Sequence, residues 1–302
     1  MKKQENIMRY DLAAAILPSR LRRIAMELPE NDRARAEEFR LRVGRCMSVL
    51  LPEGERSLEA IVTPEELETL CDIAAEFSRY ASMETLRQGF LPVRGGFRVG
   101  LCGSAVMKDG AVTNLKQISS AVIRISREQR GIAWDIAPRL FRDGRFRSTL
   151  LLSPPGGGKT TLLRDLVRQM SGGDGVPPQR ITLVDERGEV AVMYRGQPQM
   201  DVGPRTDVLD GCPKAQAIPM VLRAMNPQII AVDEITVRED LQSMAQAAGC
   251  GVSLLATIHA ASTAELEQKP LYRELLANRV FRQAVLIRVT PEGRTYTVED
   301  LP

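Results

Sequence analysis

Apolar residues alternate with polar ones in two N-terminal stretches of the chain. One stretch covers residues 39–52 and turns near Gly44, and the other covers residues 90–103 and turns at a Gly-Gly pair. Strict alternation is typical of a strand with one buried face, and paired glycines supply the positive φ angles of a tight turn. Each stretch therefore predicts a β-hairpin, and residues 118–126 predict one further strand.

A helical spacing of apolar residues begins after Thr63. Thr63 can act as the N-cap, Pro64 suits the first helical position, and Glu66 completes a capping box. The apolar stripe of this predicted helix comprises Leu67, Leu70, Cys71, Ala74 and Phe77. Residues 11–29 also indicate short helical segments, so the N-terminal part predicts a small α+β domain.

The pattern of apolar and polar residues changes after about Gly144. Polar residues and glycine at 141–147 are typical of a boundary, which divides the chain into domains 1–144 and 145–302. In the second domain, apolar runs alternate with helical patterns; the runs are residues 148–152, 180–185, 228–233 and 252–258. This order predicts an α/β domain with a mainly parallel sheet that helices cover on both faces.

A glycine-rich stretch lies between the first run and the first helix of that domain. Ser153 to Thr160 fits G-x-x-x-x-G-K-[ST], except that Ser153 replaces the first glycine. Backbone N–H groups and a helix N-terminus can hold phosphates there, Lys159 can reach the β- and γ-phosphates, and Thr160 can hold Mg²⁺. The predicted ATP-binding residues are Pro155, Gly156, Gly157, Gly158, Lys159, Thr160 and Thr161.

Two of the predicted strands end in the same Asp-Glu pair. Asp233 and Glu234 follow one strand, and Asp185 and Glu186 follow the other. The carboxyl ends of parallel strands line one sheet edge, where ligands bind. We predict that Asp233 holds Mg²⁺ together with Thr160 and that Glu234 polarises the attacking water. From the residues alone, Asp185 and Glu186 fit a solvated acidic turn equally well.

The chain has one histidine, and three of its arginines are candidates for a role in catalysis. His259 ends the 252–258 strand, where it could be structural or could donate a hydrogen bond to the γ-phosphate. Arg94, Arg98 and Arg205 are candidates for contacts with nucleotide, because phosphoryl transfer often uses an arginine from a neighbouring subunit. A solvated surface position is the more common situation for any one arginine.

Composition excludes several classes of protein. The five cysteines contain no C-x-x-C pair, so neither a disulfide framework nor a zinc site is indicated. No apolar run reaches the length of a spanning helix, and the N-terminus lacks the features of a signal peptide. We therefore expect a soluble, cytoplasmic protein. A net charge of +3 and 4% aromatic residues disfavour binding to nucleic acid.

The order of these motifs resembles that of the type II/IV secretion ATPases. In that family "SPPGGGKTT", "ITLVDERGE", "IIAVDE" and "LLATIHAAS" correspond to Walker A, an Asp box, Walker B and a His box. The segments "EEFRLRVGRCMSVLL" and "GFLPVRGGFRVGLCGSAV" further resemble the stage III sporulation AA family of endospore-forming bacteria. The resemblance covers about residues 37–289 and implies a RecA-like, two-domain ATPase that forms a homo-hexamer.

The resemblance also implies roles for particular residues. Asp185 and Glu186 become the Asp box, His259 the His-box histidine, and Arg94 and Arg98 N-domain contacts of the nucleotide. The partners implied are membrane-embedded sporulation channel proteins between mother cell and forespore, with the ATPase bound peripherally on the mother-cell side. Either Glu234 or Glu186 could be the general base, and we favour Glu234.

We therefore expect an ATP hydrolase that drives a secretion-like channel and uses ATP and Mg²⁺. Two alternatives remain at this point: a P-loop ATPase that acts on nucleic acid, and an ATP-binding scaffold with little hydrolysis.

Overall fold

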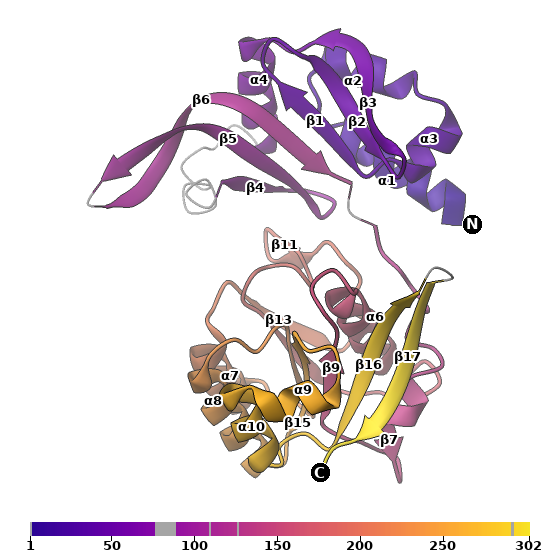
Figure 1. The fold of residues 1–302 in the computed structure, drawn as a ribbon, viewed down its shortest axis with the longest axis vertical. Coiled ribbons are helices and arrows are strands. Elements are labelled where there is room, and N and C mark those ends of the chain that lie inside the picture. The colour runs from indigo at the N-terminus through magenta and orange to yellow at the C-terminus, as the bar shows by residue number, and fades with distance from the viewer. Residues whose placement is uncertain (1, 76–88, 109, 126, 291–292) are drawn as a thin grey trace. The chain divides into compact units, whose positions relative to one another are not determined.

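The computed structural model describes residues 1–302 except 1, 76–88, 109, 126 and 291–292. The chain forms two compact units, Met1–Arg127 and Glu128–Pro302, which are described separately below (Figure 1).

The N-terminal unit combines one antiparallel sheet with four described helices. The helices are α1 (Lys2–Ala14), α2 (Ser19–Met26), α3 (Glu30–Arg35) and α4 (Pro64–Ala74). The sheet has the order β3 (Gly54–Ile61), β2 (Cys46–Leu51), β1 (Glu38–Arg42), β6 (Ala111–Arg124), β5 (Phe97–Lys108) and β4 (Phe90–Val93). Both predicted hairpins are confirmed, as β1–β2 and β4–β5.

Local sequence explains how α4 begins. The Glu66 N–H donates to the Thr63 hydroxyl over 3.3 Å, and the Thr63 N–H donates to the Glu66 carboxylate over 3.1 Å, which is the predicted capping box. Four members of the predicted stripe are buried, whereas Phe77 lies outside the described residues. They share one core with the inner face of the sheet and with α1, where Tyr10 packs 4.9 Å from Phe39 between ring centroids.

The C-terminal unit is built on a seven-stranded sheet. Its order is β13 (Thr206–Asp210), β10 (Ile181–Asp185), β14 (Ile229–Val232), β15 (Ser253–Ile258), β9 (Thr149–Leu152), β16 (Gln283–Thr290) and β17 (Gly293–Asp300). All neighbouring pairs are parallel except β16–β17, so the predicted mainly parallel sheet is confirmed.

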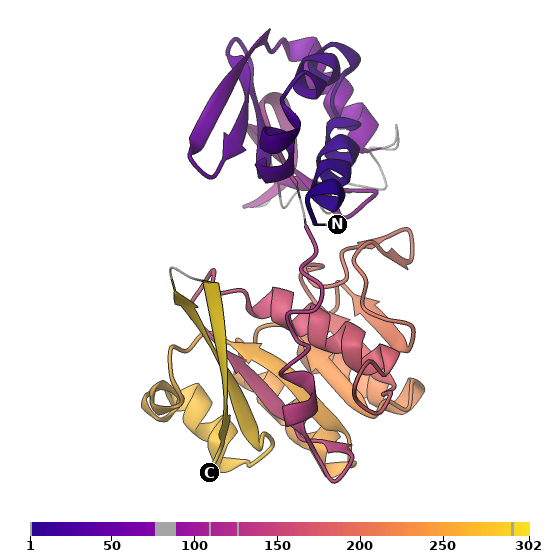
Figure 2. The ribbon, with the colours of Figure 1, turned by 90° about the vertical axis from the view of Figure 1, so that its right-hand side faces the viewer.

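Helices cover both faces of this sheet (Figure 2). The helix α6 (Lys159–Gly172) packs on one face. The other face is covered by α7 (Lys214–Ala224), α8 (Arg238–Gly249), α9 (Thr263–Gln268) and α10 (Pro270–Ala277). Two short ribbons complete the unit, β7 (Phe141–Arg142) with β8 (Arg145–Phe146) and β11 (Met193–Tyr194) with β12 (Gln197–Pro198).

The boundary between the two units lies earlier than the 144/145 division that the sequence predicted. The segment before residue 144 belongs to the C-terminal unit, because Ala133, Ile136 and Leu140 are buried in the core beside α6. The short 3-10 helix η1 (Ala137–Leu140) contacts α6 directly. The polar residues around Gly144 form the turn between β7 and β8 and not a linker.

Among the described residues, we find no helix whose length and apolar character would suit a membrane span.

Candidate nucleotide site

The glycine-rich loop connects the buried strand β9 to α6. Gly156 and Gly158 adopt positive φ angles of 76° and 99°, which open the loop for an anion. Ser153 replaces the first glycine of the motif and is buried, and its hydroxyl has no hydrogen-bond partner among the described residues. A Cβ on Gly157 would lie 1.6 Å from the Ser153 hydroxyl oxygen, so the serine side chain fills the space beside that glycine.

Lys159 points back into this loop. Its ammonium donates to the carbonyls of Ser153 and Pro154 over 3.0 and 3.2 Å, and it lies 2.8 Å from Nδ1 of His259. Burial lowers the pKa of Lys159, although Asp233 and Glu234 oppose that shift. The position brings the cation of the motif beside the only histidine of the chain.

A second set of contacts joins Thr160 to the end of β14. The Thr160 hydroxyl donates to one Asp233 oxygen over 2.9 Å, and the Thr257 hydroxyl donates to the other over 2.7 Å. A hydroxyl beside a carboxylate offers the oxygen ligands that Mg²⁺ prefers. No group of three or more His, Cys, Asp or Glu residues forms a metal site in the described part of the chain. Mg²⁺ would therefore take its other ligands from phosphates and water, as it commonly does.

Glu234 and His259 face each other at the same edge. Oε1 of Glu234 lies 3.0 Å from Nε2 of His259, and Oε2 lies 2.8 Å from Nη1 of Arg187. Because Lys159 donates to Nδ1, the proton of a neutral imidazole sits on Nε2 and is donated to Glu234. His259 thus links the cation of the loop to the carboxylate after β14.

The turn after β14 gives Glu234 its orientation. Glu234 has a φ angle of 42°, and its N–H donates to the Thr257 hydroxyl over 2.8 Å. Sequence reasoning missed both Thr257 and Arg187. Thr257 precedes His259 by two residues in an apolar strand, and Arg187 lies in the charged "DERGE" run, so neither had a distinguishing signal.

Asp185 and Glu186 have partners different from those of Glu234. The Asp185 carboxylate is buried and accepts N–H groups of Glu189, Val190 and Ala191, and burial raises its pKa. Glu186 forms an ion pair with the buried Lys214. Asp185 therefore organises the loop that follows β10. Arg164 of α6 ties that loop to the helix, through bonds to the Glu189 and Val190 carbonyls.

Comparison with known proteins identifies the family to which this chain belongs. The sequence matches the family described as "Sporulation stage III, protein AA" over residues 1–299. The chain belongs to this family. It is 36% identical over 289 residues to Stage III sporulation protein AA of Bacillus subtilis (strain 168), a match covering 95% of this chain and 94% of that protein.

Solved structures similar to this stage III sporulation AA family member include an ATPase and a pilus retraction motor. The Legionella pneumophila ATPase DotB is 15% identical with a TM-score of 0.58, over 88% of this chain and 76% of that one. The pilus retraction motor PilT with bound ADP is 16% identical with a TM-score of 0.58, over 88% and 79%. At these identities the likeness shows the fold, and it confirms the predicted RecA-like α/β class.

The three candidate arginines of this family member lie in different places. Arg98 packs 4.1 Å over the Phe90 ring in the N-terminal unit, where Arg94 is exposed. Arg205 donates to the carbonyls of Ser171 and Gly172, at the end of α6 farthest from the glycine-rich loop. A helix of this length separates Arg205 from the loop by about 20 Å. The structure therefore does not bring Arg205 to the loop of its own chain.

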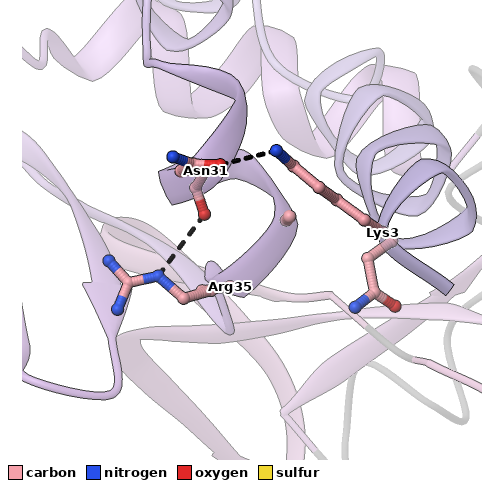
Figure 3. A pocket seen from close by; sticks show the side chains of 5 residues that line it. Lys3, Asn31 and Arg35 are labelled. Atoms are coloured by element: carbon pink, nitrogen blue, oxygen red, sulfur yellow. Dashed lines mark hydrogen bonds between the residues drawn. The ribbon is translucent and has the colours of Figure 1, made fainter.

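A groove in the N-terminal unit is lined by none of these residues. It has a volume of about 510 Å³ and is lined by Lys3, Asn6, Asn31, Ala34 and Arg35. Figure 3 shows that Lys3 and Arg35 donate to the side chain and the backbone of Asn31. Because these polar groups engage one another and none is a predicted site residue, the groove adds nothing to the nucleotide site.

Proposed function

We propose that this chain is an Mg²⁺-dependent ATP hydrolase that powers a secretion-like channel during sporulation. The observation that carries the proposal is the linked set Lys159–His259–Glu234 beside Thr160–Asp233, at the open end of a glycine-rich loop. Such a set combines a phosphate cradle, ligands for Mg²⁺ and a carboxylate able to activate water. Family membership supports the link to sporulation.

Each residue has a defined task in this proposal. The segment from Pro155 to Thr161 binds the phosphates of ATP, and Thr160 and Asp233 hold Mg²⁺. The metal would neutralise charge on the β- and γ-phosphates. Glu234 accepts a proton from the attacking water, and His259 reports the presence of the γ-phosphate because it touches both Lys159 and Glu234.

Glu234 is the stronger candidate for the general base. The Glu234 and Glu186 carboxylates both pair with a cation, but only Glu234 also contacts His259. Glu234 also directly follows Asp233, which a threonine hydroxyl holds. Arg187, which pairs with Glu234, would hold the carboxylate in a fixed orientation.

Assembly and location extend the proposal beyond the single chain. We infer a homo-hexamer that works peripherally at a membrane, on the cytoplasmic side of the mother cell, with membrane-embedded sporulation channel proteins as partners. In such a ring Arg94, Arg98 or Arg205 would contact nucleotide bound to a neighbouring subunit. The similarity in fold to a pilus retraction motor with bound ADP supports the proposed motor function.

The first test is the substitution Lys159→Ala. We expect Mg²⁺-dependent phosphate release from ATP to fall roughly 100-fold or more, because the variant loses a charge aimed at the transferred phosphate. Lys116→Ala removes an exposed lysine of β6 and serves as the matched control. Unchanged phosphate release by Lys159→Ala would overturn the assignment of the site.

A further inference from the structure

A second cation lies against the glycine-rich loop, and it comes from the far end of the sequence. Arg294 is the second residue of β17, and its Nε donates to the Gly157 carbonyl over 3.0 Å. A Cβ on Gly158 would lie 2.8 Å from that Nε and 3.3 Å from Cζ. The guanidinium therefore rests on the face of Gly158, at the N-cap of α6.

The terminal nitrogens of Arg294 remain available. Within the described residues, the only polar contact of this side chain is the bond from Nε, and the residue is exposed. A guanidinium has five N–H donors in a planar fork, which matches the geometry of a phosphate. One of the five N–H groups holds the fork on the loop, and the terminal ones form no hydrogen bond with any other described residue.

The sheet order indicates which part of a nucleotide this fork would meet. In the sheet, β15 and β14 lie on one side of β9, and β16 and β17 lie on the other side (Figure 1). Lys159 contacts His259 and Thr160 contacts Asp233, so both contacts lie on the side of β15 and β14. Mg²⁺ and the γ-phosphate belong to the side of Asp233. The α-phosphate, at the other end of a bound triphosphate, would then lie on the side of β16 and β17.

We propose that Arg294 is a ligand of the α-phosphate of the bound nucleotide, an inference that rests on the proposed binding of ATP at this loop. Lys159 and Arg294 would then clamp the triphosphate from its two ends. A side chain at Gly158 would displace the guanidinium, in addition to the backbone strain that its φ angle of 99° would impose.

The test compares two substitutions with opposite properties. Arg294→Gln keeps an N–H donor that can reach the Gly157 carbonyl but removes the charge, whereas Arg294→Lys keeps the charge and loses the fork. Titration with a fluorescent ADP should show affinity weakened about tenfold in Arg294→Gln, the value of one hydrogen bond to a charged group. We expect a loss of less than about threefold in Arg294→Lys, and a shallower salt dependence in Arg294→Gln.

Arg288→Gln is the matched control. Arg288 is an exposed arginine of β16 on the same hairpin. Because it pairs with Thr295, it faces the opposite side of the sheet from Arg294. Its substitution should therefore leave ADP affinity unchanged. Wild-type affinity in Arg294→Gln would overturn the inference and leave only a bracing role for Arg294. Failure of the wild-type protein to bind ADP would overturn the proposed function itself, and equal binding by Lys159→Ala would overturn the loop as the phosphate site.

Discussion

At the scale of single residues, the site depends on side chains that act in pairs. Asp233 is held from both sides by hydroxyls, and Glu234 is held by a histidine and an arginine. Each carboxylate therefore has a fixed direction before any substrate binds, which is how an active site lowers the cost of reorganisation.

This pairing distinguishes the two candidate general bases. Glu234→Gln keeps the size of the side chain but cannot accept a proton, so ATP turnover should fall about 100-fold or more while ADP affinity is retained. Glu186→Gln is the matched control, and we expect a several-fold smaller effect because Glu186 faces Lys214. Steady-state phosphate release and ADP titration measure the two quantities. A larger loss of turnover in Glu186→Gln than in Glu234→Gln would reverse the assignment.

At the scale of elements, the sequence predicted those parts of the fold whose signals are local. Apolar runs indicated β9, β10, β14 and β15, and chain order placed Asp233 and His259 at one edge. The strand β13 was not predicted because none of its residues is buried and polar residues occupy three of its five positions. Arg294 was not predicted because its contact depends on how a C-terminal hairpin adds to the far side of β9.

The glycine-rich loop permits a sharper test at this scale. Gly157 does not have a positive φ angle, so alanine is compatible with its backbone, and only the Ser153 side chain excludes a Cβ. Gly157→Ala should lower the free energy of unfolding by about 1–3 kcal/mol through overpacking and should weaken ADP binding.

A second substitution should reverse most of that loss. In Ser153→Gly with Gly157→Ala the hydroxyl is removed, so stability should recover in part, although the Pro154 carbonyl stays 3.2 Å from the new Cβ. Ser153→Gly alone is the control and should change stability little. Denaturant unfolding of the four proteins gives the coupling energy. Strictly additive effects would show that the two residues do not compete for the same space.

At the scale of the whole molecule, each compact unit has its own core. The N-terminal unit buries one cluster between its helices and its antiparallel sheet, and the C-terminal unit buries a cluster on each face of its parallel sheet. Units with separate cores are expected to fold independently. The sequence predicted two units. It placed their boundary too late in the chain, because the turn between β7 and β8 is rich in polar residues and glycine and therefore resembles a linker.

Two fragments of the C-terminal unit test the boundary. The fragment 128–302 contains η1 and the residues before it, whereas the fragment 145–302 begins at the boundary that the sequence predicted. Without residues 128–144, the core beside α6 loses the buried side chains of Ala133, Ile136, Ala137 and Leu140. The buried Asp165 also loses the Ala133 N–H that donates to it over 2.8 Å.

We expect 128–302 to unfold cooperatively and 145–302 to be less stable by about 3–5 kcal/mol, comparable with the loss of a large core side chain. Denaturant unfolding followed by circular dichroism measures both values. The variant Leu140→Ala in 128–302 is the matched control, since it removes one of the same apolar side chains and leaves the Ala133 bond intact. Equal stability of the two fragments would mean that the segment packs on the unit without supporting it. If the stability of Leu140→Ala lies between those of 128–302 and 145–302, the core beside α6 depends on the segment 128–144. The helix that begins at Lys159 would then depend on residues well outside the nucleotide motifs.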